Sequence, residues 1–216
     1  MEAGSGSAPQ QVADAIRGAL VHGDFAPGQR LVESEVGARY GVGRAVVREA
    51  LRLLASDGLV EIEPHRAARV RLVSLREAIE IAEVRVAVEG MVAGRAAERV
   101  TPEQAEELRD VGRRMREAVQ AFDPLGYSDL NERLHVRITE IADHEVAAAI
   151  IERLRLQLVR FNMRLSLQPG RPLTTLIDHE KVIEAIAKGD STAAETAMRG
   201  HLQEVVTTLR ATESEP

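Results

Sequence analysis

The first third of the chain changes its hydrophobic rhythm several times over short distances. Apolar residues recur at helical spacing in some segments and alternate with polar residues in others. Helices are predicted over residues 10–22, 35–40 and 44–56, and short strands over 31–32, 59–63 and 69–73. Ser34 is the expected N-cap of the second helix, and Gly41-Val-Gly43 predicts a tight break before the third.

From Ser74 onward the pattern predicts helices alone. Six are expected, over residues 74–99, 102–121, 126–141, 144–167, 174–188 and 191–210. Proline and glycine separate them at Thr101-Pro102, Asp123-Pro124, Pro169-Gly170 and Gly189-Asp190. The predicted fold class is therefore mainly α, with an N-terminal winged helix-turn-helix domain over 8–73 and an all-α helical bundle over 74–212.

The composition excludes several classes of protein. The sequence has no cysteine, so disulfides and thiolate metal sites are excluded. Its first ten residues lack the basic and apolar regions of a secretory leader, and no apolar run reaches the roughly 20 residues of a membrane helix. We therefore expect a cytoplasmic protein with no membrane partner.

The net charge of −6 argues against a DNA-binding protein until the chain is divided. Residues 1–73 have no net charge, and the whole negative excess lies in residues 74–216. DNA binding depends on whether cations gather on one face rather than on the overall charge.

Arginines gather on one face of the third predicted helix. Arg44, Arg48 and Arg52 are spaced four residues apart, opposite the apolar Val47 and Leu51. Arg44 and Arg48 lie where a recognition helix meets guanine edges in the major groove, and Arg52 is better placed for a phosphate. The alternative is a solvated face that is balanced by acidic neighbours such as Glu49.

The predicted hairpin adds two further cations. Arg66 and Arg69 flank its loop, as the wing of a winged helix would present them to the minor groove or to the phosphate backbone.

Four segments of this region resemble the DNA-binding domain of GntR-family regulators. They are Leu31-Val-Glu-Ser-Glu35, Tyr40-Gly-Val-Gly-Arg44, Val47-Arg-Glu-Ala-Leu51 and Asp57-Gly-Leu-Val60. The helical remainder resembles the FCD ligand-binding domain of the FadR subfamily, so the likeness covers about residues 10 to 210. It implies a homodimeric transcriptional regulator that binds a pseudo-palindromic double-stranded DNA operator and responds to a small organic acid.

Two positions depart from the family pattern. Gly43 replaces the usual serine or threonine before the first recognition arginine, which removes a hydroxyl able to cap the helix. Ala67 follows Arg66 where the family usually has glycine. Both departures concern detailed DNA contacts rather than the DNA-binding function itself.

Three histidines lie on three different predicted helices of the C-terminal domain. By spacing alone, His135, His179 and His201 are better explained as unrelated core or surface residues than as ligands of one metal ion. The FCD resemblance implies that they bind a divalent metal together with residue 131, which is usually aspartate. Here it is Asn131, so the expected site for Zn²⁺, Ni²⁺ or Mn²⁺ has only neutral ligands.

Arg85 and Glu89 lie one turn apart on the first helix of this domain. The resemblance implies that they line the effector pocket, where Arg85 would bind a carboxylate in a bidentate manner. The alternative is a simple ion pair between the two residues.

Two other functions compete with the regulator. A three-histidine site with an open position can activate water, so a helical metalloenzyme with a DNA-binding adaptor is the main alternative. No carboxylate is convincingly placed as its general base, and we expect no enzymatic activity. The other is an interaction module that has lost DNA binding, against which the retained Arg44, Arg48 and Arg66 argue.

Overall fold

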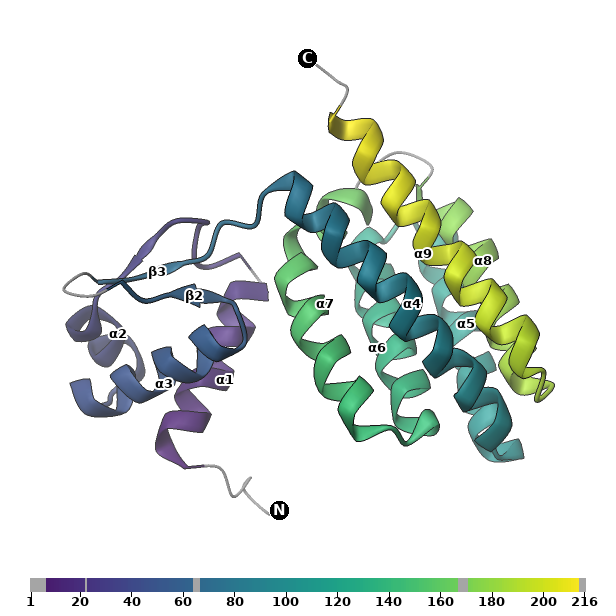
Figure 1. Cartoon of the computed structure of the whole chain (residues 1–216), viewed down its shortest axis with the longest axis horizontal. Coiled ribbons are helices and arrows are strands. Elements are labelled where there is room, and N and C mark those ends of the chain that lie inside the picture. The colour runs from purple at the N-terminus through teal and green to yellow at the C-terminus, as the bar shows by residue number, and fades with distance from the viewer. Residues whose placement is uncertain (1–6, 22, 64–66, 167–170, 214–216) are drawn as a thin grey trace. The chain divides into compact units, whose positions relative to one another are not determined.

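The computed structural model describes residues 7–21, 23–63, 67–166 and 171–213. The chain forms two compact units, residues 1–73 and residues 74–216 (Figure 1). Among the residues that the structure describes, none of the helices combines the length and the apolar content that a bilayer crossing requires.

The N-terminal unit combines helices with a small antiparallel sheet. Its elements are α1 (Ala8–Val21), β1 (Arg30–Leu31), α2 (Glu33–Tyr40), α3 (Arg44–Ser56), β2 (Val60–Glu61) and β3 (Ala68–Val70). The strands are ordered β1-β3-β2, so β3 pairs with both other strands. This order of helix, turn, helix and hairpin is the predicted winged helix-turn-helix.

The buried face of α3 packs on α1 and forms the centre of this unit. Val47, Leu51 and Leu54 are buried on α3, and Ile16 faces them from α1. Gly41 ends α2 in the left-handed conformation at φ 68°, which glycine adopts without the steric cost of a Cβ. This turn sets α2 and α3 apart as two separate helices.

The prediction that Ser34 caps α2 is wrong. The N-cap is Val32, which has no side-chain oxygen, and Ser34 is an exposed residue inside the first helical turn. Strand β1 ends at Leu31, one residue earlier than expected, and the chain leads directly from it into α2. Glu33 and Glu35 lie in the first turn, where negative charge offsets the positive end of the helix dipole.

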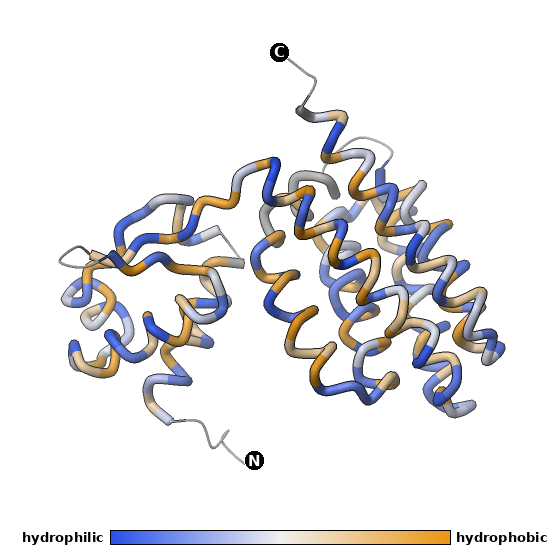
Figure 2. Tube along the Cα trace, in the orientation of Figure 1, coloured by the Kyte–Doolittle hydropathy of each residue, from blue (hydrophilic) through white to orange (hydrophobic). Residues whose placement is uncertain are grey.

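The C-terminal unit is an all-helical bundle. Its helices are α4 (Leu75–Arg99), α5 (Pro102–Gln120), α6 (Pro124–Ala142), α7 (Glu145–Ser166), α8 (Arg171–Ala187) and α9 (Ser191–Glu213). Hydrophobic and hydrophilic residues alternate along each of them (Figure 2). The apolar stripes meet in one core, whose fully buried members include Leu108, Met115, Leu134, Ile138, Ile186 and Leu202.

Two helices of the C-terminal unit, α6 and α8, begin earlier than predicted, for local reasons. Helix α6 begins at Pro124 because the Asp123 side chain accepts a hydrogen bond from the Gly126 backbone N–H. Helix α8 begins at Arg171, so Pro172 lies in its first turn, where proline needs no hydrogen-bond donor. The predicted stop at Pro169-Gly170 lies outside the described residues.

Helix α5 begins with the capping arrangement that its sequence predicts. Thr101 Oγ1 accepts a hydrogen bond from the Gln104 backbone N–H, and Gln104 Oε1 accepts one from the Thr101 N–H. The first and last helices of the C-terminal unit, α4 and α9, pack side by side (Figure 1). Gly94 allows this approach, because a Cβ there would lie 3.1 Å from the Ser191 backbone oxygen.

The core of the C-terminal unit gives a direct test of this packing. Leu108 is 0% exposed, and we expect Leu108→Ala to lower the free energy of unfolding by about 2–5 kcal/mol, because a cavity replaces packed methyl groups. Leu125 is 56% exposed, so Leu125→Ala is the matched control with a change below about 1 kcal/mol. Chemical denaturation of both variants measures the difference; equal losses would contradict the described core.

Candidate functional site

The solvent face of α3 carries the three predicted arginines. Arg44, Arg48 and Arg52 are all exposed, on the side opposite the buried Val47 and Leu51. Gly43 is the N-cap of α3 and provides no side-chain hydrogen bond, as its lack of a hydroxyl requires. The structure therefore leaves one cationic helix face open to solvent.

Two of these arginines form ion pairs. Arg48 donates from Nε and Nη2 to the two oxygens of Glu33, at 2.8 and 2.9 Å. The pKa of Glu33 is lowered mainly by this hydrogen bond, with a smaller contribution from the charge of Arg44. Arg52 pairs with Glu49 at 3.0 Å. This pair is what the alternative of a solvated face balanced by acidic neighbours predicts. Arg48 is thus held in place from α2.

The wing region is described only in part. Arg66 lies outside the described residues. Arg69 lies in the central strand β3, half-buried, opposite Arg30 of β1 and Glu61 of β2. Arg69 is therefore a sheet residue next to the wing rather than part of its loop.

In the C-terminal unit the three histidines come together. His135 of α6, His179 of α8 and His201 of α9 are all buried, with ring centroids 4.3 to 5.7 Å apart. One nitrogen of each ring lies within 4.8 Å of the others. This arrangement of imidazoles is suited to holding one divalent ion.

Hydrogen bonds fix two of the three rings. His135 Nδ1 lies 2.7 Å from Glu89 Oε2, and His179 Nδ1 lies 3.0 Å from the Tyr127 hydroxyl. Occupying Nδ1 leaves Nε2 of each ring for a ligand. His179 Nε2 is indeed buried with no hydrogen-bond partner among the described residues.

Glu89 connects the histidines to Arg85. Its Oε1 accepts a hydrogen bond from Arg85 Nε at 2.6 Å, and both side chains are buried. Although burial alone would raise the pKa of Glu89, the charge of Arg85 and the contact with His135 hold it well below its usual value. The ion pair between Arg85 and Glu89, which was the alternative to a role in the effector pocket, is therefore present. It lies inside the protein rather than on its surface.

Asn131 lies one turn before His135 on α6. Its Oδ1 is buried and has no hydrogen-bond partner in the part of the chain that the structure describes. A buried amide oxygen without a partner is costly, and a cation next to it would satisfy it. Asn131 and the three histidines therefore form a donor set that fits a metal ion, although all four donors are neutral.

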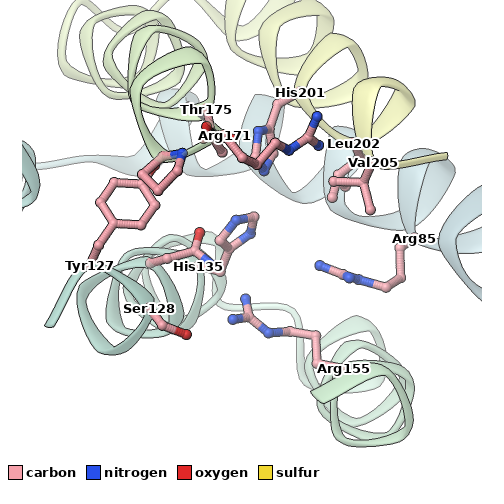
Figure 3. Close-up of a pocket in the computed structure, with 12 residues that line it drawn as sticks. Arg85, Tyr127, Ser128, His135, Arg155, Arg171, Thr175, His201, Leu202 and Val205 are labelled. Carbon is pink, nitrogen blue, oxygen red and sulfur yellow. Dashed lines mark hydrogen bonds between the residues drawn. The ribbon is translucent and has the colours of Figure 1, made fainter. Parts of the chain in front are cut away.

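A cavity of about 60 Å³ lies beside this donor set (Figure 3). Its lining comes from α4, α6, α7, α8 and α9, and consists of Arg85, Tyr127, Ser128, Asn131, His135, Arg155, Arg171, Pro172, Thr175, His201, Leu202 and Val205. Glu89 is not among these lining residues, but it hydrogen-bonds two of them, Arg85 and His135.

Sequence reasoning missed Arg155, which reaches the cavity from α7 (Figure 3). The residue is half-buried, but its Nη1 atom is enclosed and has no partner among the described residues. Burial lowers the pKa of its guanidinium to about 10. The sequence did contain an indication that Arg155 faces the interior, because it lies on the apolar stripe of α7 between the buried Ile151 and Leu158.

Two family models account for this division of the chain. The model "Bacterial regulatory proteins, gntR family" matches residues 8–70, and the FCD domain model matches residues 80–204. The chain belongs to the GntR family. Its FCD domain assigns it to the FadR type within that family.

Named relatives agree with this membership, and a solved structure has the same fold. The GntR chain is 33% identical to the "HTH-type transcriptional repressor RspR" of Escherichia coli (strain K12), over 93% of this chain and 88% of that repressor. It is 28% identical to the "Probable D-xylose utilization operon transcriptional repressor" of Paenarthrobacter nicotinovorans, over 89% and 84%. In fold it resembles E. coli McbR/YncC, with a TM-score of 0.83, 22% identity, and 97% and 100% coverage.

This GntR protein is a DNA-binding transcriptional regulator with a C-terminal effector-binding domain. The matched relatives are named as transcriptional regulators, and the metalloenzyme alternative is not favoured. The α3 face belongs to the DNA-binding domain, and the histidine cluster and its cavity belong to the effector-binding domain.

The buried histidines of this GntR protein make its stability depend on pH. Burial, together with the neighbouring cations, lowers the pKa of His179 and His201 well below the ordinary value of 6.5. The unfolded chain then binds more protons than the folded chain below pH 6.5, so stability is full above that pH and is lost as the pH falls.

We expect metal-free protein to lose roughly 1 kcal/mol per buried histidine between about pH 7.5 and 5.5. Denaturant unfolding in the presence of a chelator measures the loss. In His201→Leu the slope should be smaller, because one buried titrating ring is gone. An unfolding free energy that is constant or rises on acidification would contradict the buried, neutral state of these rings.

Proposed function

We propose that this regulator senses a small organic acid in the cavity of its C-terminal unit and changes its operator affinity in response. The enclosed, unpaired Nη1 of Arg155 is the observation that carries the proposal, because a carboxylate is the natural partner of a guanidinium. Arg85 and Arg171 line the same cavity and add positive potential. A coupling of about 1–3 kcal/mol between the two sites is enough for regulation.

A divalent ion is the second part of the proposed sensor. Asn131 Oδ1 and the free nitrogens of His135, His179 and His201 would hold Zn²⁺, Ni²⁺ or Mn²⁺. Glu89 keeps the His135 proton on Nδ1, and Tyr127 orients His179. When bound, the ion provides a Lewis-acidic contact for an oxygen of the effector.

On the DNA side, Arg44 and Arg48 are the proposed base-reading residues. Glu33 positions Arg48 through its two hydrogen bonds. Phosphate contacts are proposed for Ser34, Arg52, Arg66 and Arg69. The exposed hydroxyl of Ser34 in the first turn of α2 supports such a contact even though it does not cap the helix.

We further propose that the regulator acts as a homodimer on a pseudo-palindromic operator. Exposed apolar side chains support this: Val84 and Met91 on α4, and Val146 and Ile150 on α7. These two helices also pack against each other within the unit. A two-fold arrangement would present two α3 helices to successive major grooves.

Arg48→Ala tests the DNA-reading role. We expect specific binding to the operator upstream of the regulator's own gene to weaken by about tenfold or more, because one bidentate base contact is worth about 1–3 kcal/mol. Fluorescence anisotropy at several salt concentrations measures both the affinity and its salt dependence. Arg113→Ala, an exposed arginine of α5, is the control and should bind like the parent. Equal affinities of the two variants would contradict the proposal.

Glu89→Gln and Asn131→Asp test the metal site in opposite directions. We expect Glu89→Gln to lower the Zn²⁺ affinity by about 10- to 100-fold, because His135 loses its anionic partner. Asn131→Asp should raise the affinity, because it adds a negative ligand. Competition with a fluorescent chelator measures both, with Glu107→Gln, an exposed carboxylate of α5, as control. An affinity that none of the three changes alters would contradict a site at these residues.

A further inference from the structure

The cavity of the C-terminal unit is lined by cations without matching anions. Three arginines, Arg85, Arg155 and Arg171, contribute to its wall, and no carboxylate is among the described lining residues. Asn131 and the histidines add no negative charge, because the first is an amide and burial favours the neutral form of the rings. A ligand that fills this cavity must therefore bring negative charge with it.

The three arginines differ in how far the protein already satisfies them. Arg85 donates to Glu89, whose second oxygen is engaged by His135, so this carboxylate has no oxygen left. Arg171 donates to the Thr208 hydroxyl and is acted on by the charges of Asp178 and Glu204. Arg155 alone has an enclosed guanidinium nitrogen with no partner among the described residues.

Arg155 nevertheless remains a cation at neutral pH. Its pKa of about 10 is lowered by burial but lies well above the pH of the cell interior. The charges of Glu89 and Glu132 act on Arg155, but Glu89 is already paired with Arg85, and among the described residues neither carboxylate accepts a hydrogen bond from Nη1 of Arg155. A buried cation without a dedicated anion is a binding site for one.

Arg155 and the histidine cluster approach the cavity from different elements. Arg155 comes from α7 and His201 from α9, and in Figure 3 they lie on opposite sides of His135. The cavity thus has a cationic end at Arg155, next to Arg85, and a second end at the imidazoles.

We propose that the effector is a short dicarboxylate, with one carboxylate on Arg155 and the other at the histidine cluster. This inference rests on the effector site proposed above and specifies its ligand. Both acid groups belong in this cavity, because the adjoining cavity is lined by Asp178 and Glu204, which repel a carboxylate. The adjoining cavity shares Arg171, Thr175 and His201 with it.

Matched pairs of acids test the need for two charges. Malonate, succinate, malate and glutarate are each compared with the half-amide of the same length, by isothermal titration calorimetry on the full-length protein with its metal content measured in parallel. We expect at least one dicarboxylate to bind about tenfold or more tightly than its half-amide, because an ionic hydrogen-bonded contact at Arg155 is lost.

Variants of α7 assign this preference to Arg155. Arg155→Gln should remove the preference for the dicarboxylate, and Arg155→Lys should keep part of it through the retained charge. Arg153→Gln, an exposed arginine of the same helix, should keep it fully. Thermal unfolding of Arg155→Gln serves as the folding check, and its melting temperature should not fall, because an unpaired buried charge is removed.

Three results of these titrations would overturn the dicarboxylate. They are equal affinity for every acid and its half-amide, a preference that survives in Arg155→Gln, and no binding of any of these acids to protein that still binds its operator. Operator binding is measured beside each titration. A monocarboxylate that binds and releases the operator would overturn this inference alone, whereas protein that binds neither operator nor acid would contradict the proposed function itself.

Discussion

The buried carboxylate of Glu89 is the interaction around which the C-terminal unit is organised. It links Arg85 on its own helix to His135 on α6, with contacts of 2.6 and 2.7 Å. Removing Arg85 or Glu89 would leave the other charge inside the protein without its main compensation, which is among the costliest local defects a fold can have. The positions of α4 and α6 at this depth, and the orientation of the His135 ring, therefore depend on one carboxylate.

The DNA-binding unit also has an arginine that is held by a carboxylate, but at its surface. Glu33 accepts hydrogen bonds from Nε and Nη2 along one edge of the Arg48 guanidinium, so an arginine on one helix is ordered by a carboxylate on another. At an exposed position such a pair contributes little to stability, because water screens it. Its value lies in limiting the conformations of a long side chain before DNA arrives.

Most of the fold could be predicted from the sequence, because helical periodicity, prolines and capping residues are local signals. The arginine face of α3 and the capping box at Thr101 follow from spacing alone. The meeting of three histidines does not, because it depends on how α6, α8 and α9 pack, and a family resemblance was needed to expect it. Arg155 was not predicted, because a single arginine on an apolar stripe indicates that the side chain is buried but does not show which group it contacts. Ser34 shows the reverse error, since a residue with high capping propensity lies two positions after the N-cap, inside the first turn.

Helix α4 has a mechanical property that its chemistry does not reveal. It runs from Leu75 to Arg99 with no proline, and its first residue follows the end of the DNA-binding unit by one residue, Ser74. Fourteen residues separate Leu75 from Glu89, which corresponds to roughly 21 Å of continuous helix. An α-helix of this length behaves as a stiff rod, so a shift or rotation imposed at Glu89 reaches Leu75 with little loss.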